Sequence, residues 1–240
     1  MSELRIEQLA KRFGGLRVFH DLSFDLPAGG LLGVIGPNGA GKTTLINVIS
    51  GRQPPSGGRV FLGGRDITGQ PAYAISRMGI ARSFQQTNTF RGVSVRENIA
   101  RAVLFGRGGR PRGLERLLDE FGLAGRLDEQ SDKLPYGLQK MLGLVMAFAT
   151  GPKVLMLDEP AAGLERAERH HIDVFVQHVR EASGASVLVV EHDMDLIRRL
   201  CPRILVLDAG AVLADGPPAE VLARPDVIAA YLGTGEEEAA

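Results

Sequence analysis

A glycine-rich stretch near the N-terminus constrains the fold of this 240-residue chain more than any other feature. Gly36–Thr43 reads GPNGAGKT and fits the pattern G-x-x-x-x-G-K-[ST]. The run Leu31–Ile35 before it is continuously apolar, as in a buried parallel strand, and Thr44–Ser50 after it is predicted as a helix that ends at Gly51. Strand, glycine loop and helix in this order predict a phosphate-binding loop in an α/β fold.

The physical chemistry of this loop favours a nucleotide. Its glycines let backbone N–H groups turn inward around phosphate oxygens, and the N-terminus of the following helix adds a positive dipole. Lys42 brings a positive charge to the β- and γ-phosphates, and the Thr43 hydroxyl can ligate Mg²⁺. The predicted nucleotide-binding residues of the loop are Gly36, Pro37, Asn38, Gly39, Ala40, Gly41, Lys42, Thr43 and Thr44.

Two carboxylates end a second apolar run, Val154–Leu157. At the carboxyl end of a strand, Asp158 is placed to hold Mg²⁺ through water, and Glu159 to orient and polarise an attacking water. His192 follows the next predicted strand, Val187–Val190. A neutral imidazole there can contact the γ-phosphate and the attacking water. The three side chains therefore predict nucleotide hydrolysis.

The remaining sequence fits an α/β core with a helical insertion. Leu22, Phe24 and Leu26 alternate as in a half-buried strand. Strands and helices alternate after Gly151, which is typical of a parallel sheet covered by helices. The apolar face of the first of these helices is predicted to consist of Ile172, Phe175, Val176 and Val179. We predict a core of residues 1–87 and 151–240. A helical subdomain is predicted over residues 88–150.

Two local signals predict the helices of that subdomain. Ser94–Glu97 is a capping box, which opens a helix. A second helix is predicted from apolar residues at i, i+3, i+4 and i+7 with Gly122 as its stop, namely Leu114, Leu117, Leu118 and Phe121. Its connecting segment GRGGRPRG is interpreted as a flexible loop rather than a nucleic-acid contact.

Composition and charge exclude several classes of protein. Lys plus Arg and Asp plus Glu number 28 each, so no net charge attracts nucleic acid or anionic lipid. The single Cys201 excludes an internal disulfide framework. No secretion signal or membrane-spanning run is visible, so we expect a soluble chain that reaches a membrane only through a partner. An N-K-x-D motif, which a GTPase would need, is absent from the sequence.

Taken together, the motifs resemble those of the ATP-binding subunits of ABC transporters over essentially the full length. In this resemblance RFGG offers Phe13 to stack on adenine, and RSFQQ offers Gln85 to couple the γ-phosphate and Mg²⁺ to the helical subdomain. LPYGLQ stands in the signature position, LMLDEP with AAGL supplies Asp158 and Glu159, and VEHD supplies His192. The resemblance implies a P-loop NTPase fold of ABC type, with a mixed or parallel sheet core and an N-terminal antiparallel β region.

Finer phrases resemble the subunits that serve branched-chain amino acid transport, whose relatives also serve amides, urea or other small carboxylates. These phrases are KRFGGLRVFHDLSF, GRDITG, GIARSFQ, LDEPAAGL and VIAAYLG. The resemblance implies an ATPase that powers uptake, with Glu159, His192 and Lys42 as catalytic residues and with Thr43, Gln85 and Asp158 at Mg²⁺.

The same resemblance implies the partners and the location. Expected partners are membrane permease subunits, a second ATP-binding subunit placed head to tail and, indirectly, a periplasmic solute-binding protein, with no nucleic acid. The expected place is the cytoplasmic face of the inner membrane, as a peripheral subunit. Whether the dimer is two copies or a mixed pair stays open.

The signature loop departs from the usual L-S-G-G-Q, which closes the partner subunit's phosphate loop around ATP. Pro135 replaces the serine, Tyr136 the first glycine and Leu138 the glutamine, whereas Gly137 remains. Pro135, Tyr136 and Gly137 are still predicted to contact nucleotide. Loss of one charge-assisted hydrogen bond at Pro135 costs about 1.5–3 kcal/mol, so we expect a weakened rather than an inactive site.

Two other functions remain open on the sequence. One is a soluble ABC ATPase that acts on ribosomes or nucleic acid, against which stand the single nucleotide domain, the missing heptad run and the zero net charge. The other is a regulatory protein that binds ATP without hydrolysis, which rests on the altered signature and is opposed by the retained Glu159.

Overall fold

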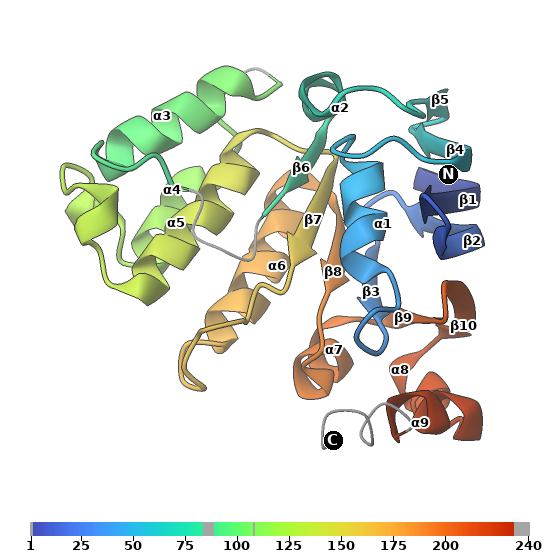
Figure 1. Ribbon diagram of the computed structural model, residues 1–240. Helices are drawn as coiled ribbons and strands as arrows, with labels where there is room; N and C mark the ends of the chain where they lie inside the picture. The colour runs from blue at the N-terminus through green and yellow to red at the C-terminus, as the bar shows by residue number, and fades with distance from the viewer. Residues whose placement is uncertain (1, 84–88, 108, 233–240) are drawn as a thin grey trace. The chain divides into compact units, whose positions relative to one another are not determined.

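The computed structural model describes residues 2–83, 89–107 and 109–232 (Figure 1). The chain divides into two compact units, of which unit 1 comprises residues 1–72 and 188–240 and unit 2 comprises residues 73–187. This partition differs from the core and helical subdomain expected from the sequence, and that division stays a prediction.

Unit 1 contains an antiparallel sheet, part of a mixed sheet and several short helices. Its elements are β1 (Ser2–Phe13), β2 (Leu16–Pro27), β3 (Leu31–Ile35), α1 (Lys42–Ile49), β4 (Gly57–Leu62), β5 (Arg65–Asp66), α7 (Met194–Leu200), β9 (Arg203–Asp208), β10 (Ala211–Gly216), α8 (Pro218–Val221) and α9 (Pro225–Leu232). The helix α1 begins two residues before the predicted Thr44, because Gly41 in the left-handed conformation serves as its N-cap.

The antiparallel sheet has the strand order β2-β1-β4-β5. Leu22, Phe24 and Leu26 of β2 face Leu9, Ile6 and Leu4 of β1 in the register, and all six side chains are buried. The alternation read from the sequence is thereby confirmed, because one face of β2 packs into a core while the other meets solvent.

The mixed sheet of unit 1 presents the phosphate loop. All five residues of β3 are buried, and β3 pairs parallel with β9, which pairs antiparallel with β10. The end of β8 (Ser186–Val190) is the other neighbour of β3. There the Glu191 amide donates to the Val34 carbonyl at 3.4 Å. The chain therefore leaves β3 and β8 close together, at Gly36 and Glu191.

Unit 2 combines helices with the strands β6 and β7 and the start of β8. Its elements are α2 (Ala72–Met78), β6 (Ile80–Arg82), α3 (Val95–Phe105), α4 (Leu114–Glu120), the short 3₁₀ turns η1 (Ala124–Arg126) and η2 (Ser131–Lys133), α5 (Tyr136–Ala149), β7 (Val154–Asp158), α6 (His170–Ser183) and the start of β8. Figure 1 shows α3, α4 and α5 gathered together, and α5 contacts both of the others.

The helices of unit 2 follow the signals in their sequences. Ser94 and Glu97 form both hydrogen bonds of the predicted capping box at the start of α3. The predicted apolar face of α4 is buried, as is that of α6, which consists of Ile172, Phe175, Val176 and Val179. In the adjoining strands β6 runs parallel to β7, with Arg82 opposite Met156. This register brings the ends of the two strands to the same edge of the sheet.

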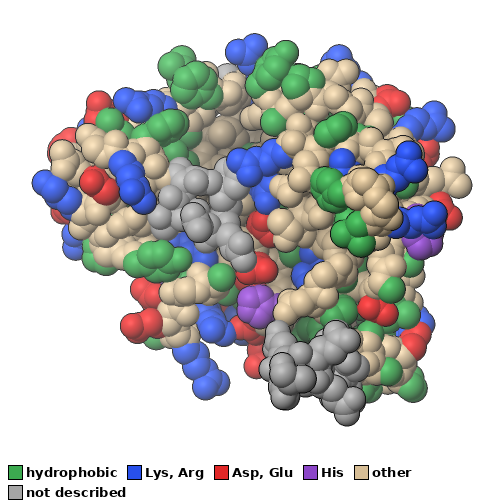
Figure 2. Space-filling model, in the orientation of Figure 1, with side chains coloured by type: hydrophobic (Ala, Val, Ile, Leu, Met, Phe, Trp, Pro, Cys, Tyr) green, Lys and Arg blue, Asp and Glu red, His purple; other side chains and the backbone are tan. Residues whose placement is uncertain are grey.

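The surface carries mixed charge. Figure 2 shows acidic and basic side chains interspersed on the visible face, as the balanced composition requires. Across residues 2–83, 89–107 and 109–232, every helix is too short or too polar to cross a bilayer.

Candidate functional site

The phosphate loop of unit 1 is shaped by glycine. Gly36, Gly39 and Gly41 have φ of 155°, 80° and 95°. A Cβ on Gly36 would lie 2.1 Å from the Leu207 carbonyl oxygen, so the strand end admits glycine alone. No side chain within the described residues caps α1. The first turn of α1 therefore presents its backbone N–H groups and positive dipole to the loop.

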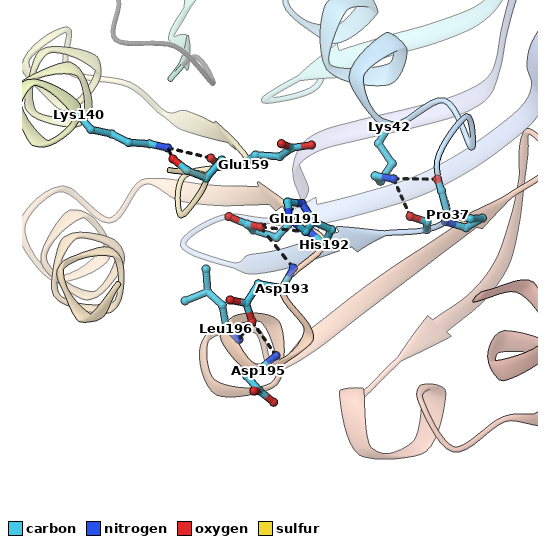
Figure 3. A network of polar contacts seen from close by, with 11 residues as sticks. Pro37, Lys42, Lys140, Glu159, Glu191, His192, Asp193, Asp195 and Leu196 are labelled. Atoms are coloured by element: carbon cyan, nitrogen blue, oxygen red, sulfur yellow. Dashed lines mark hydrogen bonds and ion pairs between the residues drawn. The ribbon is translucent and has the colours of Figure 1, made fainter. Parts of the chain in front are cut away.

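Lys42 reaches back across the loop from the first turn of α1. Its ammonium donates to the carbonyls of Gly36 at 2.6 Å and Pro37 at 2.9 Å (Figure 3). Thr43 beside it is exposed, and Thr44 is half-buried. The predicted loop residues from Gly36 to Thr44 thus form one continuous loop and first helical turn. The Lys42 ammonium lies against the loop backbone that is expected to bind phosphate.

His192 also belongs to unit 1. Its side chain is 66% exposed, and Nδ1 lies 3.9 Å from the carboxylate of Glu191, which is buried. That carboxylate accepts the backbone N–H groups of His192 at 3.1 Å and Asp193 at 3.5 Å (Figure 3). Asp193 in turn caps α7. Glu191 therefore fixes the backbone that presents the imidazole, a role that the sequence alone did not indicate.

The ring of Phe13 lies at the end of β1 and is 45% exposed. The ammonium of Lys11 sits 4.6 Å from the ring centre, which keeps the side chain of Phe13 oriented. The exposed face of this ring is accessible, and its stacking on adenine stays a prediction.

Tyr231 of α9 was missed by sequence reasoning. Burial raises the pKa of its hydroxyl, which lies near the backbone of Gly36. Tyr231 belongs to the phrase VIAAYLG, in which no residue was given a role. The C-terminal helix is thus in contact with the first glycine of the phosphate loop.

In unit 2 the carboxylates end β7 as predicted. Asp158 is 3% exposed, and its Oδ2 accepts a hydrogen bond from the Arg82 guanidinium at 2.6 Å. Arg82 was not predicted as part of the site. It stands at the end of β6, and the parallel register of β6 and β7 brings the two side chains together.

Glu159 follows in a left-handed conformation, with φ of 47°. Its carbonyl accepts from the Ala162 amide at 3.1 Å and from the Lys140 ammonium at 3.3 Å (Figure 3). Left-handed backbone in a residue other than glycine costs about 1–3 kcal/mol and is common at functional sites. Lys140 is a second contact that sequence reasoning missed.

The signature loop opens α5. Pro135 is the N-cap residue, and no described side chain caps the helix there. Tyr136 is 49% exposed. At Gly137 an added Cβ would lie 2.3 Å from a carboxylate oxygen of Glu168, so a larger residue there would require the Glu168 side chain to move. The loop therefore keeps an uncapped helix N-terminus, which is the feature that binds anions.

One predicted site residue and three histidines remain to be placed. Gln85 lies outside the described residues. His170, His171 and His178 pack with aromatic rings. Within the described part of the chain no cluster of His, Cys, Asp and Glu could hold a metal by itself. Mg²⁺ would therefore need oxygen ligands from the nucleotide as well as from the protein, which is the usual arrangement for this ion.

Comparison with known proteins finds family models that match two parts of the chain. Residues 19–162 match the family model described as ABC transporter, and residues 211–237 match that described as branched-chain amino acid ATP-binding cassette transporter. The chain is 38% identical to the high-affinity branched-chain amino acid transport ATP-binding protein LivG of Salmonella typhimurium, over 96% of this chain and 97% of that one.

Two further relatives cover nearly the same length. The BraF ATP-binding protein of Pseudomonas aeruginosa is 36% identical over 96% of this chain and 97% of its own. A solved structure of the ADP conformation of an ATP-binding cassette of an ABC transporter is 28% identical, with a TM-score of 0.84 over 97% of this chain and 99% of that one.

Proposed function

We propose that this chain, which belongs to the family of ABC transporter ATP-binding subunits, is the ATP-hydrolysing motor of an importer for branched-chain or related amino acids or amides. The observation that carries the proposal is the phosphate loop of Gly36–Thr43, with its left-handed glycines and uncapped helix, in a chain that also keeps Asp158 and Glu159 at a strand end. The solute class is supported by relatives that match nearly the whole chain.

In the proposed mechanism the residues of unit 1 bind the nucleotide. The backbone from Gly36 to Thr44 surrounds the phosphates, and Lys42 exchanges its carbonyl partners for β- and γ-phosphate oxygens. Phe13 stacks on adenine. Thr43 and Gln85 would hold Mg²⁺ through side-chain oxygen, the donor that this ion prefers, and Asp158 would hold it through water.

Hydrolysis is proposed to use Glu159 and His192. Glu159 accepts a proton from the attacking water as it aligns with the γ-phosphorus, and the leaving group is ADP. The exposed His192 imidazole contacts the γ-phosphate and orients the water, while Glu191 holds its backbone. Mg²⁺, when bound, neutralises the charge that develops on the phosphate oxygens.

The partner subunits are proposed from the family. Subunits of this kind dimerise and act with membrane permeases, and we propose a head-to-tail dimer in which Pro135, Tyr136 and Gly137 contact the nucleotide of the other subunit. Leu104 and Phe105 at the end of α3 are 76% and 65% exposed. Two such neighbouring apolar side chains support a contact with a permease at the cytoplasmic face of the inner membrane, supplied by a periplasmic solute-binding protein.

The test is the Mg²⁺-ATP hydrolysis rate of the purified chain as its concentration is raised. We expect a rate that grows as the square of protein concentration at low protein, because each site needs the signature loop of a second subunit. Glu159→Gln is expected to reduce turnover to a small residual rate and to retain ATP binding. A first-order rate would refute the composite site, and binding without turnover would favour the regulatory ATP-binding protein.

A further inference from the structure

Lys140 is a buried cation on a helix that has no other charged residue. The sequence of α5 is YGLQKMLGLVMAFA, and Lys140, one turn after the signature loop, is 4% exposed. Burial of an ammonium is costly unless hydrogen bonds stabilise its charge. A lysine at such a position therefore needs specific partners, and its partners lie in the backbone turn that carries the candidate catalytic residue Glu159.

The ammonium of Lys140 donates to two main-chain carbonyls, those of Glu159, at 3.3 Å, and Ala162 (Figure 3). These carbonyls belong to one turn, because the Ala162 amide also donates to the Glu159 carbonyl at 3.1 Å. The turn directly follows Asp158, the last residue of β7. A single cation thus bridges the helix of the signature loop and the turn that carries Glu159.

The turn needs such support because of its backbone. Glu159 has φ of 47°, a region that side-chain-bearing residues rarely adopt and that persists only where the surroundings determine it. In the left-handed conformation the carbonyl of Glu159 points to Lys140. If that carbonyl turned away, the Glu159 side chain would change direction with it.

We propose that Lys140 is the positioning residue for Glu159, holding the left-handed turn so that the carboxylate is directed at the attacking water. This inference rests on the proposed role of Glu159 in hydrolysis. It assigns Lys140 no contact with nucleotide.

The position of Lys140 on α5 adds a consequence. Tyr136 opens α5 four residues earlier, a distance of about 6 Å along the helix. Lys140 therefore connects the helix that follows the signature loop to the turn that carries Glu159.

The experiment compares Lys140→Met, which keeps most of the length of the side chain without its charge, with Lys140→Arg and with Lys153→Met. Lys153 is an exposed lysine of the same unit, just before β7. For Lys140→Met we expect kcat to fall about ten- to hundred-fold, the loss that follows from a charge-assisted hydrogen bond. The ATP dissociation constant should stay within about threefold, and Lys140→Arg should recover part of kcat.

A second measurement separates positioning from a general loss of structure. If Lys140 acts through Glu159, adding Lys140→Met to Glu159→Gln should lower kcat no further, because the two changes remove one function. Multiplying losses in the double variant would overturn the proposal, as would an unchanged kcat in Lys140→Met. Should Lys140→Met fail to fold, Lys140→Arg and its combination with Glu159→Gln give the same comparison.

The two hypotheses fail in different ways. If Glu159→Gln hydrolyses ATP at the rate of the unchanged chain, the proposed catalytic role of Glu159 is wrong. If Glu159→Gln keeps only a small residual rate while Lys140→Met resembles Lys153→Met in kcat, the function stands and only the positioning role is refuted.

Discussion

Replacing Arg82 by methionine tests the interpretation of the Asp158 site most directly. The side chains of Arg82 and Asp158 are 8% and 5% exposed, and they meet at 2.6 Å. The variant removes the guanidinium and leaves a buried carboxylate without that cation. Methionine keeps most of the volume of the arginine side chain, so the loss of stability arises from the missing charge rather than from a cavity.

The structure sets the expected magnitude. Removing one partner of a buried ion pair costs about 3–5 kcal/mol, because the remaining charge stays in a medium of low dielectric constant. For a chain of this size about 2–4 °C is lost per kcal/mol, so the midpoint of thermal unfolding should fall by about 6–20 °C. Arg126→Met breaks a surface pair with Glu129, whose side chains are 42% and 45% exposed, and should cost less than about 1 kcal/mol.

The assay is urea unfolding followed by far-ultraviolet circular dichroism, since the chain contains no tryptophan to report by fluorescence. EDTA is present and nucleotide is absent, so that Mg²⁺ does not replace the missing cation. Adding Asp158→Asn to Arg82→Met should cost less than the sum of the two single losses. A loss below about 1 kcal/mol in Arg82→Met, equal to that of Arg126→Met, would refute the reasoning.

Three smaller predictions follow from other contacts. Ser94→Ala removes the capping box of α3 and should lower the free energy of unfolding by about 1 kcal/mol in the same urea assay. Burial lowers the pKa of His178 and of His171, so the unfolded chain binds protons near pH 6.5 before the folded chain does. Stability should therefore fall as pH drops from 7 to 5, and His178→Gln should reduce this dependence in thermal unfolding. Burial raises the pKa of Tyr231, so stability should fall above about pH 10, where the unfolded phenol ionises first, and Tyr231→Phe should show a smaller fall.

Much of the fold follows from periodicity and local signals. The continuous apolar run of β3 is buried along its whole length. The capping box at Ser94 and the apolar face of α6 are also found where the sequence placed them. These features depend on residues at most a few positions apart, so that the sequence carries them directly.

The contacts that were missed depend on how distant segments meet. Arg82 and Asp158 are 76 residues apart, and Lys140 and Glu159 are 19 apart. Neither pair has a spacing that a motif records, because the parallel pairing of β6 with β7 and the packing of α5 bring them together. Glu191 was passed over for another reason. A carboxylate inside VEHD looks like a surface residue until its burial is known.

The contacts around the candidate site show how ligand binding can act on it. Lys42 donates to the carbonyls of its own loop, Arg82 to Asp158, and Lys140 to the turn of Glu159. Phosphate and Mg²⁺ would therefore replace hydrogen-bond partners that the charged side chains of the protein already have. The affinity of the loop is then a difference between two sets of hydrogen bonds, which is smaller than either set. The glycines of the loop already hold its backbone N–H groups in position, so that the exchange of hydrogen-bond partners at Lys42 needs only a side-chain movement. A change in the direction of Glu159, in contrast, must move the backbone turn to which Lys140 donates. Under the proposed function, nucleotide binding would be local to the phosphate loop, whereas catalytic alignment of Glu159 would depend on α5.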